Sequence, residues 1–128
     1  MKRVYVDSSC LVAIALEESG SQALLVRVAR FDQRFSSNLL EAELRSALAR
    51  EGRRSRVGNS LAWVRWVLPR RRLTPEIDQV LSTGWLKGAD LWHLACALFL
   101  RSHVDHLSFL TLDGRQGEIA RSLGFDVS

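Results

Sequence analysis

The sequence predicts an α/β fold, with a mainly parallel sheet of about four to five short strands flanked by helices on both faces. Short runs rich in β-branched and aromatic residues alternate along the chain with longer segments of helical period. One of these segments, "ADLWHLACALFLRS" at 89–102, is apolar nearly all round, which is typical of a helix buried between a sheet and other elements. Short strands that alternate with helices favour parallel pairing.

The first half of the chain is expected to begin with a strand. "RVYV" at 3–6 is a predicted strand that ends at Asp7, and "LVAIALEE" and "SQALLVRVARF" carry helical patterns. "RFSS" is a brief strand-like link into a helix over 39–49. "SLAWVRWVL" at 60–68 is predicted to be a further helix, closed by Pro69.

In the second half, a short extended segment around Leu73 leads into a helix that begins at "TPE", where an N-cap is followed by proline. The apolar helix at 89–102 comes next. "HLSFLTLD" is the clearest strand after the first one. "GRQGEIARSLGFDV" predicts a last helix, a glycine stop at Gly124 and a terminal strand.

The chain has 128 residues, 47% of them hydrophobic, so we expect one domain over 1–128 with a single core. The basic and apolar start of the chain is split by Asp7, and two glutamates stand where a signal peptide needs small residues. No segment approaches the roughly 18 apolar residues of a membrane span. We therefore expect a cytoplasmic protein. Cys10 and Cys96 lie in apolar runs and are expected to be buried free thiols.

The positive charge is concentrated in one stretch. The formal net charge is +4, and residues 45–72 hold nine arginines against one acid, Glu51. Guanidinium groups pair with phosphates, and the interleaved Trp63 and Trp66 offer rings on which unpaired bases stack. This stretch suits contact with a polyanion. A solvated helical face is the alternative, since charge runs commonly do no more than keep a surface wet.

A carboxylate interrupts the apolar face of the helix "LLEAELRSALA". At about 100° per residue, Glu43 shares one face with four leucine and alanine residues. An unpaired ionised carboxylate is costly to desolvate, so Glu43 must meet a cation, change its pKa or lie at the edge of a cleft. A frayed apolar stripe with Glu43 reaching water is the structural alternative.

Three further acids lie where a site would form. Asp7 and Asp113 follow predicted strands, and if these strands are neighbours both carboxylates reach one edge of the sheet. Each could also serve only as a helix N-cap. Asp90 begins the most hydrophobic helix of the chain. Together with Glu43 these acids predict one acidic pocket, in which neutralising Glu43 or Asp90 would stabilise the protein without metal.

Four stretches of the chain resemble the motifs of the PIN domain, most closely those of the VapC-like toxins of bacterial and archaeal toxin–antitoxin pairs. They are "VYVDSSCLVAIALEE", "LLEAELRSALAR", "ADLWHLACALFL" and "FLTLDGR". The stretches stand in family order and span nearly the whole chain. No single stretch is specific, but the four together are.

The resemblance implies a Mg²⁺- or Mn²⁺-dependent ribonuclease whose acids fall on Asp7, Glu43, Asp90 and Asp113. Hard divalent ions are also what an all-oxygen site favours. The expected roles are direct or water-mediated metal binding by the three aspartates, and metal binding or orientation of water by Glu43. No serine, histidine and acid arrangement, phosphate loop or Cys/His cluster offers another chemistry.

The resemblance also implies an RNA substrate, a homodimer and a small antitoxin partner. Ser9 and Thr111 match positions where the family often carries hydroxyls, and we expect them to support the acids. Arginines of the 45–72 stretch are expected to hold the RNA backbone. The RNA-binding candidates are Arg50, Arg53, Arg54 and Arg56.

Two positions limit the resemblance. His93 matches a histidine common in these toxins, but on an apolar helix we expect it to pack rather than bind metal. Glu118 stays outside the acidic set because Gly114, Gln116 and Gly117 stand where many members carry a further acid or asparagine, so one and two metal ions both stay open. The alternative function is a catalytically inactive PIN-like module that binds RNA or protein, and DNA as a substrate also stays open.

Overall fold

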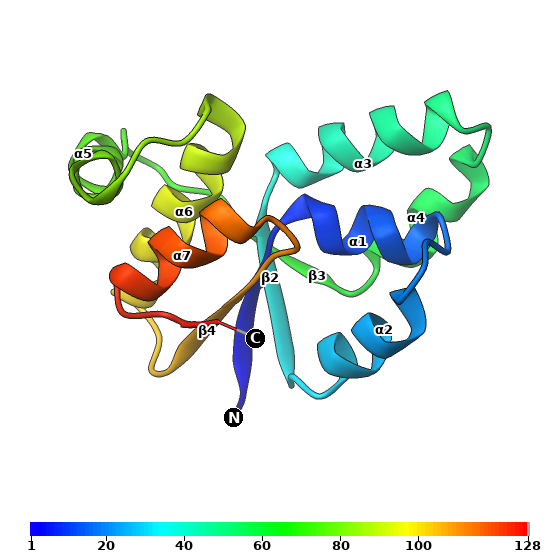
Figure 1. Ribbon diagram of the computed structural model, residues 1–128, viewed down its shortest axis with the longest axis horizontal. Coiled ribbons are helices and arrows are strands. Elements are labelled where there is room, and N and C mark those ends of the chain that lie inside the picture. Colours follow the sequence, from blue (N-terminus) through cyan, green and yellow to red (C-terminus); the bar gives the residue numbers. More distant parts are fainter. Residues whose placement is uncertain (128) are drawn as a thin grey trace.

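The computed structural model describes residues 1–127 and contains one parallel sheet of five strands with helices on both faces (Figure 1). The strands are β1 (Arg3–Val6), β2 (Gln33–Ser37), β3 (Val64–Val67), β4 (Leu107–Leu110) and β5 (Asp126–Val127). The helices are α1 (Ser8–Ala15), α2 (Ser21–Ala29), α3 (Leu39–Arg50), α4 (Val57–Leu61), α5 (Thr74–Thr83), α6 (Gly88–Arg101) and α7 (Gly114–Ser122), with a short 3₁₀ turn, η1 (Arg54–Arg56). The predicted α/β class with parallel pairing is confirmed.

The strand order is β3-β2-β1-β4-β5. The direction in which successive strands are added across the sheet therefore reverses at the boundary between β1 and β4. Crossovers in parallel sheets are right-handed, and a reversal therefore moves the following helices to the opposite face. In Figure 1, α1 to α4 lie on one side of the sheet and α5 to α7 on the other. Such a reversal opens a crevice at the carboxyl ends of the two central strands, β1 and β4.

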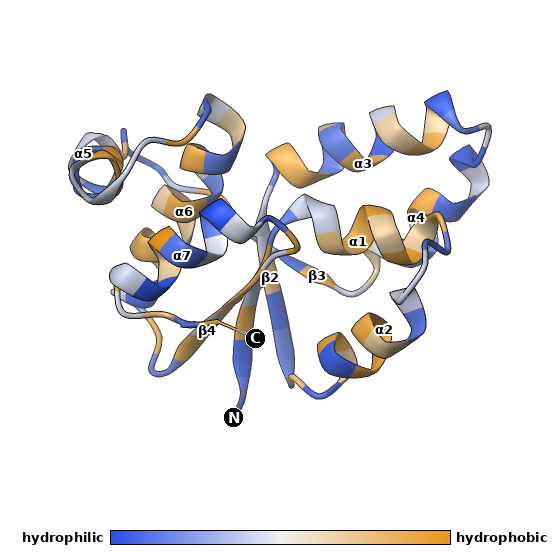
Figure 2. Cartoon of the chain, in the orientation of Figure 1, coloured by the Kyte–Doolittle hydropathy of each residue, from blue (hydrophilic) through white to orange (hydrophobic). Residues whose placement is uncertain are grey.

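Alternate residues of β1 pack into two cores, one on each face of the sheet, rather than into the single core expected from the sequence. Val4 and Val6 lie in the core with α1 and α3, whereas Tyr5 lies in the core with α6. The rings of Tyr5 and Phe109 are stacked with their centroids 5.5 Å apart. Figure 2 shows hydrophilic residues at the amino ends of β1 and β2, where the strands leave these cores.

The helix predicted over 60–68 is wrong. Helix α4 ends at Leu61, and Val64–Val67 forms the edge strand β3, which pairs in parallel with β2. Two valines and a tryptophan favour this extended backbone, and Val67 is buried once the strand is paired. The backbone hydrogen bonds to β2 thus outweigh a local helical pattern. The segment around Leu73 is a loop that buries this leucine, rather than a strand.

Helix α6 has the buried character that its composition predicts. Seven of its 14 residues are buried, including His93. Its length is about 21 Å at about 1.5 Å per residue. Within residues 1–127 no helix is both long and apolar enough to cross a membrane.

Both cysteines are buried free thiols, as predicted. Burial raises the pKa of each thiol to about 12, with a further contribution from Asp7 for Cys10 and from Glu76 for Cys96. Since the thiolate is the reactive form, these two side chains act as small apolar residues of the cores.

Candidate active site

Asp7 and Asp113 lie at the same edge of the sheet, as the sequence predicts. Val6 and Leu110 are paired at the ends of β1 and β4, and the Asp7 backbone N–H donates to the Leu110 carbonyl at 2.9 Å. Both acids also cap helices. Asp7 Oδ2 accepts from the Ser9 N–H at 3.2 Å, and Asp113 Oδ1 accepts from the Gln116 N–H at 3.0 Å. Capping therefore occupies one oxygen of each carboxylate.

The second oxygen of Asp7 is buried and has no hydrogen-bond partner. Asp7 is only 3% exposed, and its Oδ1 makes no hydrogen bond within residues 1–127. The nearest cationic candidate, His93 Nε2, is 3.7 Å from this oxygen. Native structures rarely leave a buried carboxylate oxygen unsatisfied, because desolvation without a partner is costly. Asp7 Oδ1 thus fits an oxygen that binds a ligand, and a cation is the ligand that suits its charge.

Glu43 meets a buried partner rather than water alone. Its Oε1 lies 2.8 Å from His93 Nε2, and its side chain is 31% exposed. Burial raises the pKa of Glu43, but its interactions with His93, Ser8 and Lys87 outweigh this effect, and the pKa lies below its usual value. This contact opposes the prediction that Glu43 is destabilising in the absence of metal, because the sequence alone did not show that a histidine would lie beside it.

His93 joins the two cores of the molecule through hydrogen bonds. It is fully buried, as expected of a packing residue, but its Nδ1 lies 2.7 Å from the Tyr5 hydroxyl. The Tyr5 oxygen accepts from the Ser37 N–H at 3.0 Å. Burial, with Cys96 nearby, raises the pKa of Tyr5 well above its usual value, so this hydroxyl keeps its proton and donates to Nδ1. In the neutral imidazole the proton is then on Nε2, which donates to Glu43.

Asp90 lies in the first turn of α6 and is affected by the other acids. Burial raises the pKa of Asp90, and the charges of Asp7 and Asp113 raise it further against the opposing effects of Lys87 and His93. Lys87 Nζ is 4.0 Å from Asp90 Oδ2. The structure thus brings Asp90, Asp7 and Asp113 close enough for their charges to interact, although they come from three separate segments.

The two predicted hydroxyls differ in what they contact. Thr111 Oγ1 lies 2.7 Å from Gln116 Oε1 and 3.4 Å from Asp7 Oδ2, and it accepts from the Asp113 N–H at 3.0 Å. Since a hydroxyl has one hydrogen, the shorter contact is the bond that it donates. Ser9 Oγ instead accepts from the Leu112 N–H at 3.1 Å and fixes the loop after β4.

Sequence reasoning missed the side chains that hold the acids in place. Tyr5 looked like an ordinary strand residue, and nothing marked Gln116 beyond the absence of a family acid. Gln116 is fully buried and donates from Nε2 to the Asp90 backbone carbonyl at 3.2 Å. A polar residue among apolar neighbours on a predicted buried face was the pattern that could have identified both His93 and Gln116.

The arrangement fits a hydrated cation better than a closed ligand cage. No three His, Cys, Asp or Glu side chains in the described part of the chain are arranged to hold a metal ion together. Mg²⁺ commonly keeps several waters and takes only one or two carboxylates directly, so a closed set is not needed. The unpartnered Asp7 oxygen and the raised pKa of Asp90 are both features that a bound cation would relieve.

A family model for the PIN domain matches residues 4–122. The chain belongs to the PIN domain family. PIN domains are generally nucleases that bind RNA, and they usually depend on Mg²⁺. No curated protein sequence matches the chain.

The arginines predicted to bind RNA lie at the far end of α3 of this PIN domain. Arg50 follows Glu43 by seven residues, about 10 Å along the helix axis at about 1.5 Å per residue. Arg56 is already engaged, since it donates to the Ala15 carbonyl at 2.6 Å and lies 3.6 Å from Glu17. Of the four predicted arginines, Arg53 and Arg54 are exposed and form no ion pair within residues 1–127, so their guanidinium groups are free to meet a phosphate.

Proposed function

We propose that this PIN domain is a metal-dependent endoribonuclease that hydrolyses RNA phosphodiester bonds. The observation that carries the proposal is the acidic edge of the sheet, where Asp7 presents a buried oxygen without a partner beside Asp90 and Asp113. Glu43 is held at the same edge by His93. Membership of the PIN family supports the nuclease chemistry.

Asp7, Asp90 and Asp113 would hold Mg²⁺ or Mn²⁺, directly or through water. When bound, such an ion stabilises negative charge that develops on the phosphate. The lowered pKa of Glu43 keeps its carboxylate ionised at neutral pH, and this carboxylate would orient the attacking water in line with the leaving oxygen. Thr111 and Gln116 would fix Asp113 and the start of α6 while the substrate binds.

The biological role that we propose is the toxin of a VapBC-type pair, acting in the cytoplasm as a homodimer that a small antitoxin inhibits. The order of the four motifs supports this role. Exposed apolar side chains near the acidic edge offer a partner surface: Trp85 is 71% exposed and Leu112 is 51% exposed. Trp85 precedes α6, which carries Asp90, and Leu112 precedes Asp113.

Purified protein incubated with total RNA is the experiment that tests this function. Cleavage is expected with Mg²⁺ or Mn²⁺ and none with a chelator, and mapped ends should show internal cuts. RNA binding without cleavage in any of these conditions would instead favour the inactive PIN-like module. Single-stranded DNA in a parallel reaction decides whether both nucleic acids are cut.

Changing Arg53 and Arg54 together to glutamine should weaken RNA binding across many sequences. Phosphate contacts supply affinity without reading bases, and the loss of two of them should lower the slope of log affinity against log salt by about 1.4 for a single strand. Fluorescence anisotropy with labelled oligonucleotides over a range of salt concentrations measures this slope. Arg121→Gln is the control, because it removes an exposed charge on α7, outside the 45–72 stretch. An unchanged slope in the Arg53 and Arg54 variant would identify a merely solvated surface.

A further inference from the structure

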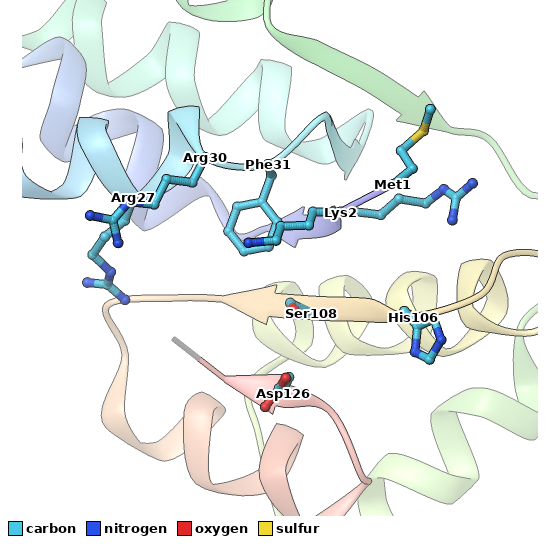
Figure 3. Close-up of a pocket in the computed structure, with 9 residues that line it drawn as sticks. Met1, Lys2, Arg27, Arg30, Phe31, His106, Ser108 and Asp126 are labelled. Carbon is cyan, nitrogen blue, oxygen red and sulfur yellow. The ribbon is translucent and has the colours of Figure 1, made fainter.

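A cavity lies at the amino ends of β1 and β4, at the edge of the sheet opposite to the acidic residues. Its volume is about 630 Å³, which lies in the range of pockets for small ligands. It is lined by Met1, Lys2, Arg3, Arg27, Arg30, Phe31, His106, Ser108 and Asp126 (Figure 3). The length of β1, about 13 Å at about 3.3 Å per residue, separates this cavity from Asp7.

The cavity exists because no helix covers this part of the sheet. Leu110 of β4 packs in the core with α1 and α3, so Ser108, two residues earlier, faces the same side. Ser108 pairs in register with Val4 of β1 and with Asp126 of β5. Helix α7 packs with α5 and α6 in the other layer, so this face of β4 and β5 stays open beyond α2.

Unpaired positive charge surrounds the cavity. Lys2, Arg27 and Arg30 form no ion pair within residues 1–127, and their side chains make no hydrogen bond there. Asp126 is the single acid of the lining. By contrast, Arg3 is held in place, with Nε donating to Gln33 at 2.9 Å and Nη1 donating to the Asp105 carbonyl at 3.0 Å. The lining therefore carries an excess of positive charge, which favours an anionic ligand.

The lining also contains groups that suit the rest of a nucleotide. In Figure 3 the ring of Phe31 lies between Lys2 on one side and Arg27 and Arg30 on the other, with Ser108 and Asp126 across the gap. Phe31 is half-buried, so one face of its ring packs on the core while the remainder lines the cavity. Aromatic rings stack on bases of any sequence, and hydroxyl and carboxylate groups bond ribose hydroxyls or base amines.

We propose that this cavity binds a nucleotide, with the phosphate on Arg27 and Arg30 and the base against Phe31. Guanidinium groups match phosphate oxygens in charge and in geometry. A free nucleotide and one nucleotide of an RNA chain present the same chemistry. The site is separate from the acidic edge and does not depend on cleavage.

Calorimetric titration in chelator tests this site without contribution from a metal-loaded acidic edge. The probes are adenosine 5′-monophosphate, adenosine, inorganic phosphate and a short 2′-O-methyl RNA, which resists cleavage. Arg27→Gln with Arg30→Gln should weaken the monophosphate, the RNA or both by about tenfold or more, since two charge-assisted contacts are lost. Arg121→Gln removes an exposed charge on α7, outside both the cavity lining and the 45–72 stretch, and should change affinity by less than about twofold.

The same titrations separate the two sources and the two parts of the ligand. If the Arg27 and Arg30 variant loses affinity for adenosine 5′-monophosphate, a free nucleotide is a sufficient ligand for the cavity. If the variant loses affinity for the RNA alone, the ligand is a nucleotide within an RNA chain. Phe31→Leu should lower the affinity for whichever nucleotide probe binds, and it should leave the affinity for inorganic phosphate unchanged. Equal affinities in the natural chain and the Arg27 and Arg30 variant, or an equal loss in Arg121→Gln, would overturn the site. An unaltered nucleotide affinity in Phe31→Leu would overturn the base contact.

Discussion

Expression of the natural chain without a partner should arrest bacterial growth, and Asp7→Asn should abolish the arrest. Asparagine keeps the oxygen that caps α1 through the Ser9 N–H, so the fold should survive the change. It removes the negative charge behind the buried, unpartnered oxygen. Loss of such a ligand should lower RNA cleavage by about a hundredfold or more.

Colony counts after induction and cleavage rates of the purified proteins measure this effect. Asp78→Asn is the control, because Asp78 is an exposed acid on α5 away from the acidic edge. The control should arrest growth like the natural chain. If Asp7→Asn still arrests growth while its purified protein is folded, toxicity does not arise from the acidic edge, and the toxin proposal fails in its catalytic form.

Replacement of His93 should have the largest effect on stability. His93 is fully buried. His93→Leu leaves the Tyr5 hydroxyl without its hydrogen-bond acceptor and Glu43 without its hydrogen-bond donor. Loss of buried hydrogen-bond partners costs about 1 to 3 kcal/mol each, so we expect a free energy of unfolding lower by roughly 2 to 5 kcal/mol. Urea denaturation measures it.

Two related variants separate packing from hydrogen bonding. Tyr5→Phe keeps the stacked ring on Phe109 but removes the hydroxyl between Ser37 and His93, so it should lose less stability than His93→Leu. His93→Gln keeps an N–H donor for Glu43 and should recover part of the cleavage that His93→Leu loses. A His93→Leu protein as stable and as active as the natural chain would show that these contacts carry neither function nor stability.

The sequence predicted the order of most elements because each carries a local pattern. Strands such as "RVYV" end at acids, and α6 is apolar nearly all round. The exception was β3, where four residues gain their strand geometry from pairing with β2 across the sheet. Such tertiary contacts between distant segments leave no local pattern in a short edge strand.

The acidic residues were predicted because charges on apolar helix faces and at strand ends can be recognised in the sequence. Their partners were not. Tyr5 and His93 are 88 residues apart, and the contact of Glu43 with His93 spans 50 residues. No periodicity encodes such distances. For the same reason, one electrostatic role was predicted for both Glu43 and Asp90, whereas the structure shifts their pKa values in opposite directions.

Thermal unfolding with and without metal tests most directly whether the acids of four segments form one cation-binding edge. The raised pKa of Asp90 means that its ionised form costs stability once the pH exceeds the unfolded value, so Asp90→Asn should melt higher than the natural chain in chelator at neutral pH. The lowered pKa of Glu43 has the opposite sign. Its ionised form contributes stability above the unfolded value and loses it as pH falls, so Glu43→Gln should melt lower.

Mg²⁺ or Mn²⁺ should raise the melting temperature of the natural chain by an amount that grows with ion concentration, because the ions bind only the folded acids. Asp90→Asn and Asp7→Asn should gain less from the same ions, whereas Asp78→Asn should gain as much as the natural chain. An unchanged melting temperature of the natural chain in both ions, together with Asp90→Asn melting lower in chelator, would contradict a shared cation site at this edge of the sheet.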